Sequence, residues 1–217
     1  MRVYSIFNSI DGEVNRWGQG RFSTFIRFSG CNLRCNYCDT KYAQDMDCGK
    51  EMSVEEILEE VKKIGCRKIT ITGGEPLLQA EMKDFLYLLF NQGYKVSIES
   101  NGSFRPILNL PYCWVMDWKL ASSGMSEYMN LENFRDLSSE DFVKFVIQDR
   151  LDYDDALVVI KRLRILECYA TFAFSPAQDK IDPADLIEWM KEDKLFDVIV
   201  NLQLHKYVWG KNPGKEV

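Results

Sequence analysis

Three cysteines, Cys31, Cys35 and Cys38, lie within eight residues in the segment CNLRCNYCDT. The residues between them, such as Asn32 and Asn36, are polar and typical of a loop. Thiolates are ligands for soft metal ions and for iron–sulfur clusters. The spacing C-x3-C-x2-C therefore predicts a metal centre on a short loop.

A structural zinc ion is one alternative, but such a site takes four protein ligands. The single histidine, His205, lies far along the chain, and Cys48 would give an unusual spacing. A cubane iron–sulfur cluster on three thiolates leaves one iron without a protein ligand. That open iron can bind a ligand or substrate, so a [4Fe–4S] cluster explains the missing fourth ligand.

The remaining four cysteines have no ligand-like spacing. Cys113 and Cys168 lie in apolar, strand-like runs, which predicts buried structural thiols. Seven cysteines is an odd number, and the N-terminal segment MRVYSIFNSI is too short and too polar for a signal peptide. We therefore expect reduced thiols and a cytoplasmic protein.

The rest of the chain alternates between helix and strand patterns. Helices are predicted over residues 53–65, 81–93, 152–164 and 182–193, the first opening with a capping box of Ser53 and Glu56. Strands are predicted over residues 68–74, 94–100, 112–120, 141–147, 168–174 and 197–204. Strands rich in Val and Ile with helices between them indicate a mainly parallel sheet covered by helices.

About six strands are too few for a closed eight-stranded barrel. The expected fold class is therefore α/β, as a partial, open β/α barrel with catalytic groups at the carboxyl ends of its strands. A length of 217 residues fits one domain over residues 1–217. The formal net charge of −6 argues against a nucleic-acid partner, and no run approaches the roughly 18 apolar residues of a membrane span.

The cysteine triplet on a loop after a strand resembles the signature of the radical S-adenosylmethionine (SAM) superfamily, with Tyr37 as the aromatic residue between the last two cysteines. The segment ITGGEP, residues 71–76, resembles the glycine-rich turn that binds the methionine end of SAM. Gly73 and Gly74 let the backbone approach a ligand, and Glu75 can bind an ammonium group. The resemblance implies a cluster whose open iron chelates SAM, and a deoxyadenosyl radical that takes a hydrogen atom from the substrate.

The segments that flank the triplet, the segment ESNGS (residues 99–103) and the C-terminal NLQLHKYVWG resemble the 7-carboxy-7-deazaguanine synthase family over almost the whole chain. This resemblance implies a carbon–nitrogen lyase that converts 6-carboxy-5,6,7,8-tetrahydropterin to 7-carboxy-7-deazaguanine with loss of ammonia, for queuosine and related deazapurines. It also implies Mg²⁺, a reductant of the flavodoxin or ferredoxin type, and a homodimer.

The same resemblance implies the roles of individual residues. The cluster would be bound by Cys31, Cys35 and Cys38, and Mg²⁺ by the hydroxyl of Thr40. SAM would be bound by Tyr37, Gly74, Glu75, Ser100, Asn101, Asp117, Trp118, Lys119, Ser175, Pro176 and Ala177. The pterin would be bound by Ile10, Asp11, Gly12, Glu13, Arg27, Thr72 and His205. Within this set Glu13 suits the guanidine-like edge of a pterin, and Arg27 suits its carboxylate.

The first loop departs from the family pattern Gln-Gly-Glu-Gly, since it reads Asp11-Gly12-Glu13-Val14. Asp11 lacks the amide donor of glutamine. Val14 has fewer backbone conformations than glycine. These two differences would change the pose of the substrate.

Two other functions stay open on the sequence alone. A glycyl-radical-enzyme activase has the same cysteine spacing but acts on a large protein, whereas the segments SIDGE and LHKYVWG suit a small polar ring. A non-catalytic cluster-binding module would hold the same cluster without cleaving SAM.

Overall fold

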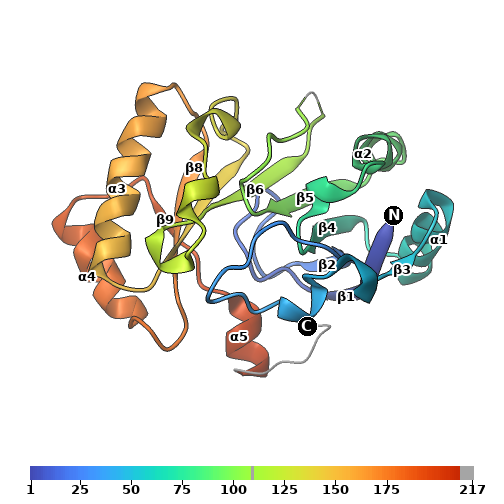
Figure 1. The fold of residues 1–217 in the computed structure, drawn as a ribbon, viewed down its shortest axis with the longest axis horizontal. Helices are drawn as coiled ribbons and strands as arrows, with labels where there is room; N and C mark the ends of the chain where they lie inside the picture. Colours follow the sequence, from blue (N-terminus) through green and yellow to red (C-terminus); the bar gives the residue numbers. More distant parts are fainter. Residues whose placement is uncertain (109, 211–217) are drawn as a thin grey trace.

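The computed structural model describes residues 1–108 and 110–210, and every strand in these residues joins one sheet (Figure 1). The strands are β1 (Arg2–Ile10), β2 (Phe22–Phe28), β3 (Lys50–Glu51), β4 (Lys68–Gly73), β5 (Lys95–Ser100), β6 (Cys113–Trp118), β7 (Phe142–Ile147), β8 (Thr171–Pro176) and β9 (Ile199–Val200). Their order across the sheet is β3-β1-β2-β4-β5-β6-β7-β8-β9. β1 pairs antiparallel with β2 and β3, and every neighbouring pair from β2 to β9 is parallel. Because the two end strands do not pair within the described residues, the predicted open, mainly parallel barrel is confirmed.

Five helices accompany the sheet in the described residues. They are α1 (Val54–Ile64), α2 (Met82–Asn91), α3 (Arg150–Ile165), α4 (Pro183–Glu192) and α5 (Leu204–Trp209). In Figure 1, α1 and α2 lie toward one end of the sheet and α3 and α4 toward the other. The predicted capping box is present: Ser53 accepts from the Glu56 amide, and the Glu56 side chain accepts from the Ser53 amide. Helix α1 ends at Ile64 and is capped by Gly65, whose φ of +79° favours a glycine.

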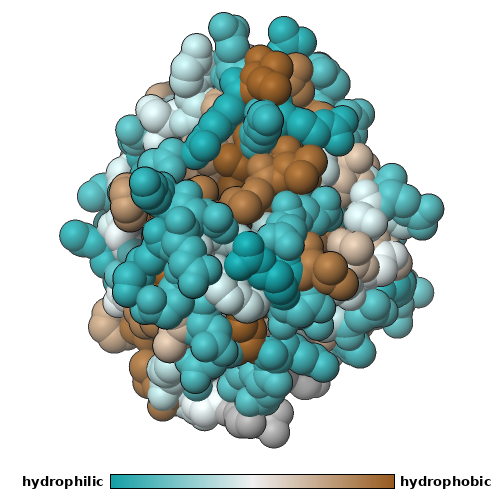
Figure 2. Space-filling view, turned by 90° about the vertical axis from the view of Figure 1, so that its left-hand side faces the viewer, coloured by the Kyte–Doolittle hydropathy of each residue, from teal (hydrophilic) through white to brown (hydrophobic). Residues whose placement is uncertain are grey.

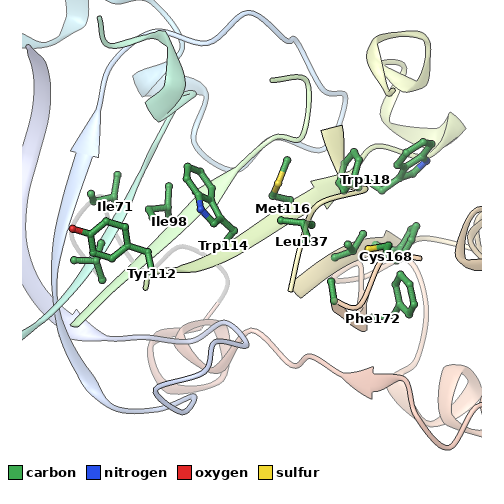
Figure 3. Packing of buried hydrophobic residues seen from close by; sticks show 14 of the residues in the cluster. Ile71, Ile98, Tyr112, Trp114, Met116, Trp118, Leu137, Cys168 and Phe172 are labelled. Atoms are coloured by element: carbon green, nitrogen blue, oxygen red, sulfur yellow. The ribbon is translucent and has the colours of Figure 1, made fainter. Parts of the chain in front are cut away.

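Alternate residues of the parallel strands face two different environments, as the pleat of a strand requires. The outward set packs in the main hydrophobic core: Ile69, Ile71, Ile98, Trp114, Met116, Val143 and Phe145. Figure 3 shows part of this core, running from Ile71 and Ile98 through Trp114 to Phe172. The inward set is largely polar: Arg27, Thr70, Thr72, Ser97, Glu99, Asp117 and Lys144. The interior of the partial barrel is therefore a polar environment.

The strand predicted over residues 197–204 is wrong in its second half. Only Ile199–Val200 pairs with β8, and residues 204–209 form α5 instead. The chain leaves the sheet because other donors and acceptors bind this segment: Gln19 donates to the Leu202 carbonyl at 2.6 Å, and the Leu204 amide donates to the Gly12 carbonyl at 3.3 Å. His205 consequently lies in a short helix and not near the end of a strand.

The N-terminal hairpin of β1 and β2 was not predicted, although it supplies the strand that precedes the cysteine loop. The prediction of one domain over residues 1–217 stays a prediction, and it includes residues 109 and 211–217, which lie outside the described residues. Cys113 and Cys168 are buried as predicted. No helix in the described part of the chain is long and apolar enough to cross a bilayer.

Candidate active site

A cavity of about 930 Å³ opens where the parallel strands end. Gly73 and Gly74 at the end of β4, Ser100 at the end of β5 and Lys119 after β6 all line it. The cavity brings together these predicted site residues: Ile10, Gly12, Glu13, Arg27, Cys31, Cys35, Tyr37, Cys38, Thr40, Thr72, Gly74, Ser100, Asn101, Asp117, Lys119, Ala177 and His205. Residues separated by almost the whole chain thus share one polar chamber.

The cysteine loop follows β2 and turns its three thiols to the cavity. All three are free and half-buried. Cys31 Sγ accepts from the Leu33 amide at 3.4 Å and from Asn101 Nδ2 at 3.6 Å. Burial raises the pKa of Cys31 despite these hydrogen bonds, and burial also raises the pKa of Cys35 against the opposing charge of Lys119.

The glycine-rich turn after β4 packs directly against the backbone that leads into the cysteine loop. The Gly74 amide donates to the Phe28 carbonyl at 3.0 Å, and the Glu75 amide donates to the Gly30 carbonyl at 2.7 Å. A Cβ on Gly74 would overlap the Gly30 carbonyl. Only a residue without a side chain fits here. The close backbone contact and its hydrogen bonds hold the two loops in one arrangement.

Charged side chains alternate in sign along one side of the cavity. Lys144 lies 3.1 Å from both a Glu13 and an Asp117 carboxylate oxygen, and Lys119 lies 2.6 Å from the other Asp117 oxygen. Although burial opposes it, the two ammonium groups lower the pKa of Asp117. The pKa of Lys144 is raised, again against burial, by Asp117 and Glu13. Asp117 and Lys144 are therefore both charged at neutral pH.

Arg27 from β2 reaches the same cavity. Its guanidinium lies over the rings of Phe7 and Tyr42, with Cζ 5.6 and 5.8 Å from the ring centroids. Its buried Nε has no hydrogen-bond partner among the described residues. A buried donor of this kind needs an acceptor, which a bound anion can supply.

Glu99 from β5 and His205 from α5 complete the chamber. Glu99 accepts from the Thr72 hydroxyl at 2.7 Å, and burial, followed by the charges of Glu13 and Asp11, raises the pKa of Glu99 to about 7. Burial also lowers the pKa of His205, although Glu13 opposes the shift, so this imidazole is neutral at pH 7. The chamber thus offers both hydrogen-bond donors and acceptors to a ligand.

Comparison with known proteins agrees with this geometry. A family model described as the radical SAM superfamily matches residues 25–109. A 7-carboxy-7-deazaguanine synthase of Clostridium acetobutylicum is 39% identical over 97% of this chain and 97% of its own length, and one of Koribacter versatilis is 37% identical over 96% and 97%. The chain belongs to the 7-carboxy-7-deazaguanine synthase family. The crystal structure of QueE from Escherichia coli, 21% identical, shares the fold with a TM-score of 0.68 over 93% of both chains.

Members of the radical SAM superfamily use a [4Fe–4S] cluster and SAM, and the residues of this chain fit both groups. No three His, Cys, Asp or Glu side chains in the described residues gather around a single metal ion. A cubane does not need this, because each thiolate binds a different iron. The free thiols facing one cavity, with amide donors to Cys31, suit such a cluster. Gly74, Ser100 and Asn101 line the same cavity beside the cysteine loop, so SAM would have polar groups and exposed backbone next to the cluster.

Five of the residues predicted for SAM or the pterin do not line the large cavity: Asp11, Glu75, Trp118, Ser175 and Pro176. Trp118 faces outward because its neighbour Asp117 faces inward, and its ring lies 5.1 Å from that of Phe134. Ser175 donates to the Asn201 carbonyl, and Pro176 borders a smaller adjoining pocket. Their direct contact with a ligand stays a prediction.

Glu75 is fully buried behind the glycine-rich turn. Its carboxylate accepts from the Leu77 amide, from the Ser100 hydroxyl and from the Asn101 amide, the last at 2.7 Å. Burial raises the pKa of Glu75 to about 7 even so. The side chain therefore links two loops of the SAM-type site, and its contact with the ammonium group of a ligand stays a prediction.

Asp11 is also buried, with 1% of its surface exposed. Its Oδ2 accepts from the Lys68 ammonium and, at 2.7 Å, from the Thr70 hydroxyl. Its Oδ1 accepts from the Glu13 amide at 3.2 Å. The residue that departs from the family glutamine thus has a buried cation as its partner and holds the loop that carries Glu13.

Several charged and amide residues of the cavity were not predicted from the sequence: Asp39, Glu99, Lys144, Gln203 and Lys206. Glu99 and Lys144 had a usable signal, because each is a charged residue within a strand predicted to be buried on both faces. The side chain of Gln203 donates to Glu13 at 2.7 Å, and Lys206 lies 3.2 Å from Asp39. These last contacts come from α5 and from the residue that precedes it, and the sequence did not predict this helix.

Proposed function

We propose that this chain converts 6-carboxy-5,6,7,8-tetrahydropterin to 7-carboxy-7-deazaguanine with release of ammonia. The observation that carries the proposal is a single chamber. Its wall contains three free cysteines, the unpartnered Nε of Arg27, and the carboxylates of Glu13 and Glu99. A ligand for such a chamber needs an anionic group and a polar, donor-rich edge. A carboxylated pterin has both.

The residues divide naturally between the two parts of this substrate. Arg27 suits the carboxylate, because a guanidinium binds it with two parallel hydrogen bonds. Glu13 suits the amino-pyrimidine edge as an acceptor, and its orientation is fixed by Asn201, Gln203 and Lys144. The neutral imidazole of His205 can donate or accept a hydrogen bond on the same ligand.

Cys31, Cys35 and Cys38 would hold the cluster, and Gly74, Ser100 and Asn101 would border SAM. When bound, these groups supply the carbon radical that removes a hydrogen atom from the substrate. The residues of the chain hold the pterin carboxylate and ring edge, so that one carbon of the ring is presented to that radical. Glu99 has a pKa near 7 and can take or give a proton as the ring rearranges.

Magnesium is part of the proposal through Thr40. Its hydroxyl faces the cavity and donates to Asp39 at 2.9 Å. Although burial opposes it, the Lys206 ammonium and this hydroxyl lower the pKa of Asp39. A hydroxyl, a nearby carboxylate, substrate oxygens and water suit Mg²⁺, which keeps few protein ligands.

The proposal includes a flavodoxin- or ferredoxin-type reductant, a homodimer and a cytoplasmic location, where free thiols stay reduced. The two alternatives lose support. The similar relatives are synthases, and the chamber places its charged groups around a small-molecule volume, which a glycyl-radical-enzyme activase or a cluster-binding module would not need.

The test is anaerobic reconstitution with iron and sulfide, followed by dithionite, SAM, Mg²⁺ and 6-carboxytetrahydropterin. We expect 7-carboxy-7-deazaguanine by mass, and its loss in Cys31→Ala, Cys35→Ala and Cys38→Ala. Cys48→Ala and Cys66→Ala are matched controls that should retain product formation. SAM cleavage without formation of the deazaguanine would contradict the proposed substrate. A reconstituted protein that does not cleave SAM would contradict the proposal that the chain is a radical SAM enzyme.

A further inference from the structure

Helix α3 exposes an apolar stripe on its outer face. Leu151, Val158 and Ile165 are 79%, 56% and 72% exposed, and they are spaced seven residues apart. At about 100° per residue, that spacing places them on one line along the helix. Figure 2 looks at the side of the molecule that carries α3 and α4, where hydrophobic residues reach the surface among hydrophilic ones.

The charged residues beside the stripe are acidic in one half of α3 and basic in the other. Asp154 and Asp155 lie in the N-terminal half of α3, and Lys161 and Arg162 lie in its C-terminal half, all exposed. Asp154 pairs with Arg150 of the same helix. Within the described residues Asp155, Lys161 and Arg162 form no ion pair, so their charges are available to a partner.

These residues are arranged symmetrically about Val158. Asp155 and Lys161 lie three residues to either side, Asp154 and Arg162 four residues, and Leu151 and Ile165 seven residues. When two such helices cross antiparallel at Val158, each acidic residue faces a basic residue of the other helix, and each outer apolar residue faces an apolar one. A twofold axis requires this kind of self-complementary surface.

We propose that α3 is the contact surface between two copies of this chain, with the two α3 helices antiparallel and a twofold axis at Val158. The partner is a second copy because the four charged residues beside the stripe, two acidic and two basic, lie in a self-complementary order, whereas Arg150 and Arg164 at the ends of the helix pair with Asp193 and Asp197. An acidic reductant or a nucleic acid would need an excess of one sign. This inference rests on the proposed homodimer and is independent of the proposed reaction, since no α3 residue lines the cavity.

Phe196 extends the surface beyond the end of α3. It is 83% exposed, and its neighbour Asp197 accepts from Arg164 in the last turn of α3 at 2.5 Å. In the antiparallel arrangement this end meets the N-terminal end of the other α3, near Leu151. One pair of 16-residue helices lies at the small end of stable interfaces, so we expect a dimer that dissociates in the micromolar range.

Sedimentation velocity of the full chain across a concentration series tests this surface. Asp155→Lys and Lys161→Asp should each weaken the dimer by roughly tenfold or more, because like charges then face each other. The chain with both substitutions should recover the dimer, and so should an equimolar mixture of the two single variants. Glu59→Lys and Lys62→Asp on α1 are the matched controls, and circular dichroism checks that every variant is folded.

The outcomes separate the surface from the dimer itself. A wild-type chain that stays monomeric at all concentrations would overturn both the homodimer and the α3 contact. A wild-type dimer that Asp155→Lys, Lys161→Asp and Val158→Asp leave intact would keep the homodimer and overturn α3 as its surface. SAM cleavage by the reconstituted variants is expected to be unchanged, so neither result bears on the reaction.

Discussion

Asp11 and Lys68 form a buried ion pair inside the partial barrel, with side chains 1% and 7% exposed. Two charges removed from water are stable together only when further hydrogen bonds satisfy them. The Thr70 hydroxyl and the Glu13 amide provide these bonds to Asp11. The aspartate that replaces the family glutamine is therefore part of a charge-compensated unit, and its effect on the substrate acts through the position of Glu13.

The pair gives a first prediction. Asp11→Asn leaves Lys68 buried without a counter-charge and should lower the free energy of unfolding by about 3 kcal/mol. Lys68→Met should have a similar effect, and the double variant Asp11→Asn with Lys68→Met should lose less than the sum of the two. Urea unfolding of all four proteins measures this. Additive losses would show that the two side chains do not act as a pair.

Glu99 gives a second prediction, on pH dependence. Its pKa is raised by burial from 4.5 to about 7, so between these values the folded chain keeps a proton that the unfolded chain has released. The stability contributed by Glu99 is full below pH 4.5 and is lost as the pH rises through about 7. Glu99→Gln should therefore gain stability relative to wild type on going from about pH 5 to about pH 8. Glu55→Gln on the exposed face of α1 should show no such trend in the same unfolding series.

At the scale of elements, the loop after β4 and the loop after β2 work as one unit. The Gly74 and Glu75 amides donate to carbonyls of the β2 loop, and Glu75 accepts from the loop after β5. A small change in one loop must move the others, because interiors are close-packed. The cluster site therefore depends on backbone contacts at least as much as on its three cysteines.

This coupling gives the third prediction. Gly74→Ala places a methyl group against the Gly30 carbonyl and should cost about 1–3 kcal/mol by overpacking. It should also lower the iron and sulfide bound per chain after reconstitution. Gly65→Ala is the control, because a Cβ at Gly65 meets no atom within 4 Å, although its positive φ still costs about 1 kcal/mol. Iron content equal in both variants would argue against the coupling.

The elements also show how far the sequence could be interpreted. Helices α1 to α4 and most of the parallel strands were predictable, because each has a clear period and clear ends. Among the polar residues at alternate strand positions, Lys144 and Glu99 were missed because apolar residues dominate the pattern around them. Helix α5 was not predictable, because six residues do not form a stable helix alone. Its position depends on distant partners such as Gly12.

At the scale of the whole molecule, the two ends of the chain close the polar interior. The loop between β1 and β2 contacts the segment after β9, although about 190 residues separate them. Asn201 is fully buried at this junction: its Oδ1 accepts from the Val14 amide at 3.0 Å and from Gln19 at 3.1 Å, and its Nδ2 donates to Glu13. An open barrel with a charged interior needs such a closure to keep water from its ion pairs.

Asn201 therefore supports the last prediction. Asn201→Ala removes one donor and one acceptor at once, leaves the Val14 amide and a Glu13 oxygen short of partners, and should lower the free energy of unfolding by about 2–3 kcal/mol. Because Glu13 is then less well oriented, KM for the pterin should rise more than kcat falls. Asn91→Ala, at the exposed end of α2, should change stability by less than about 0.5 kcal/mol and leave both constants alone. A loss of stability in Asn201→Ala with KM unchanged would mean that the closure stabilises the fold without positioning Glu13.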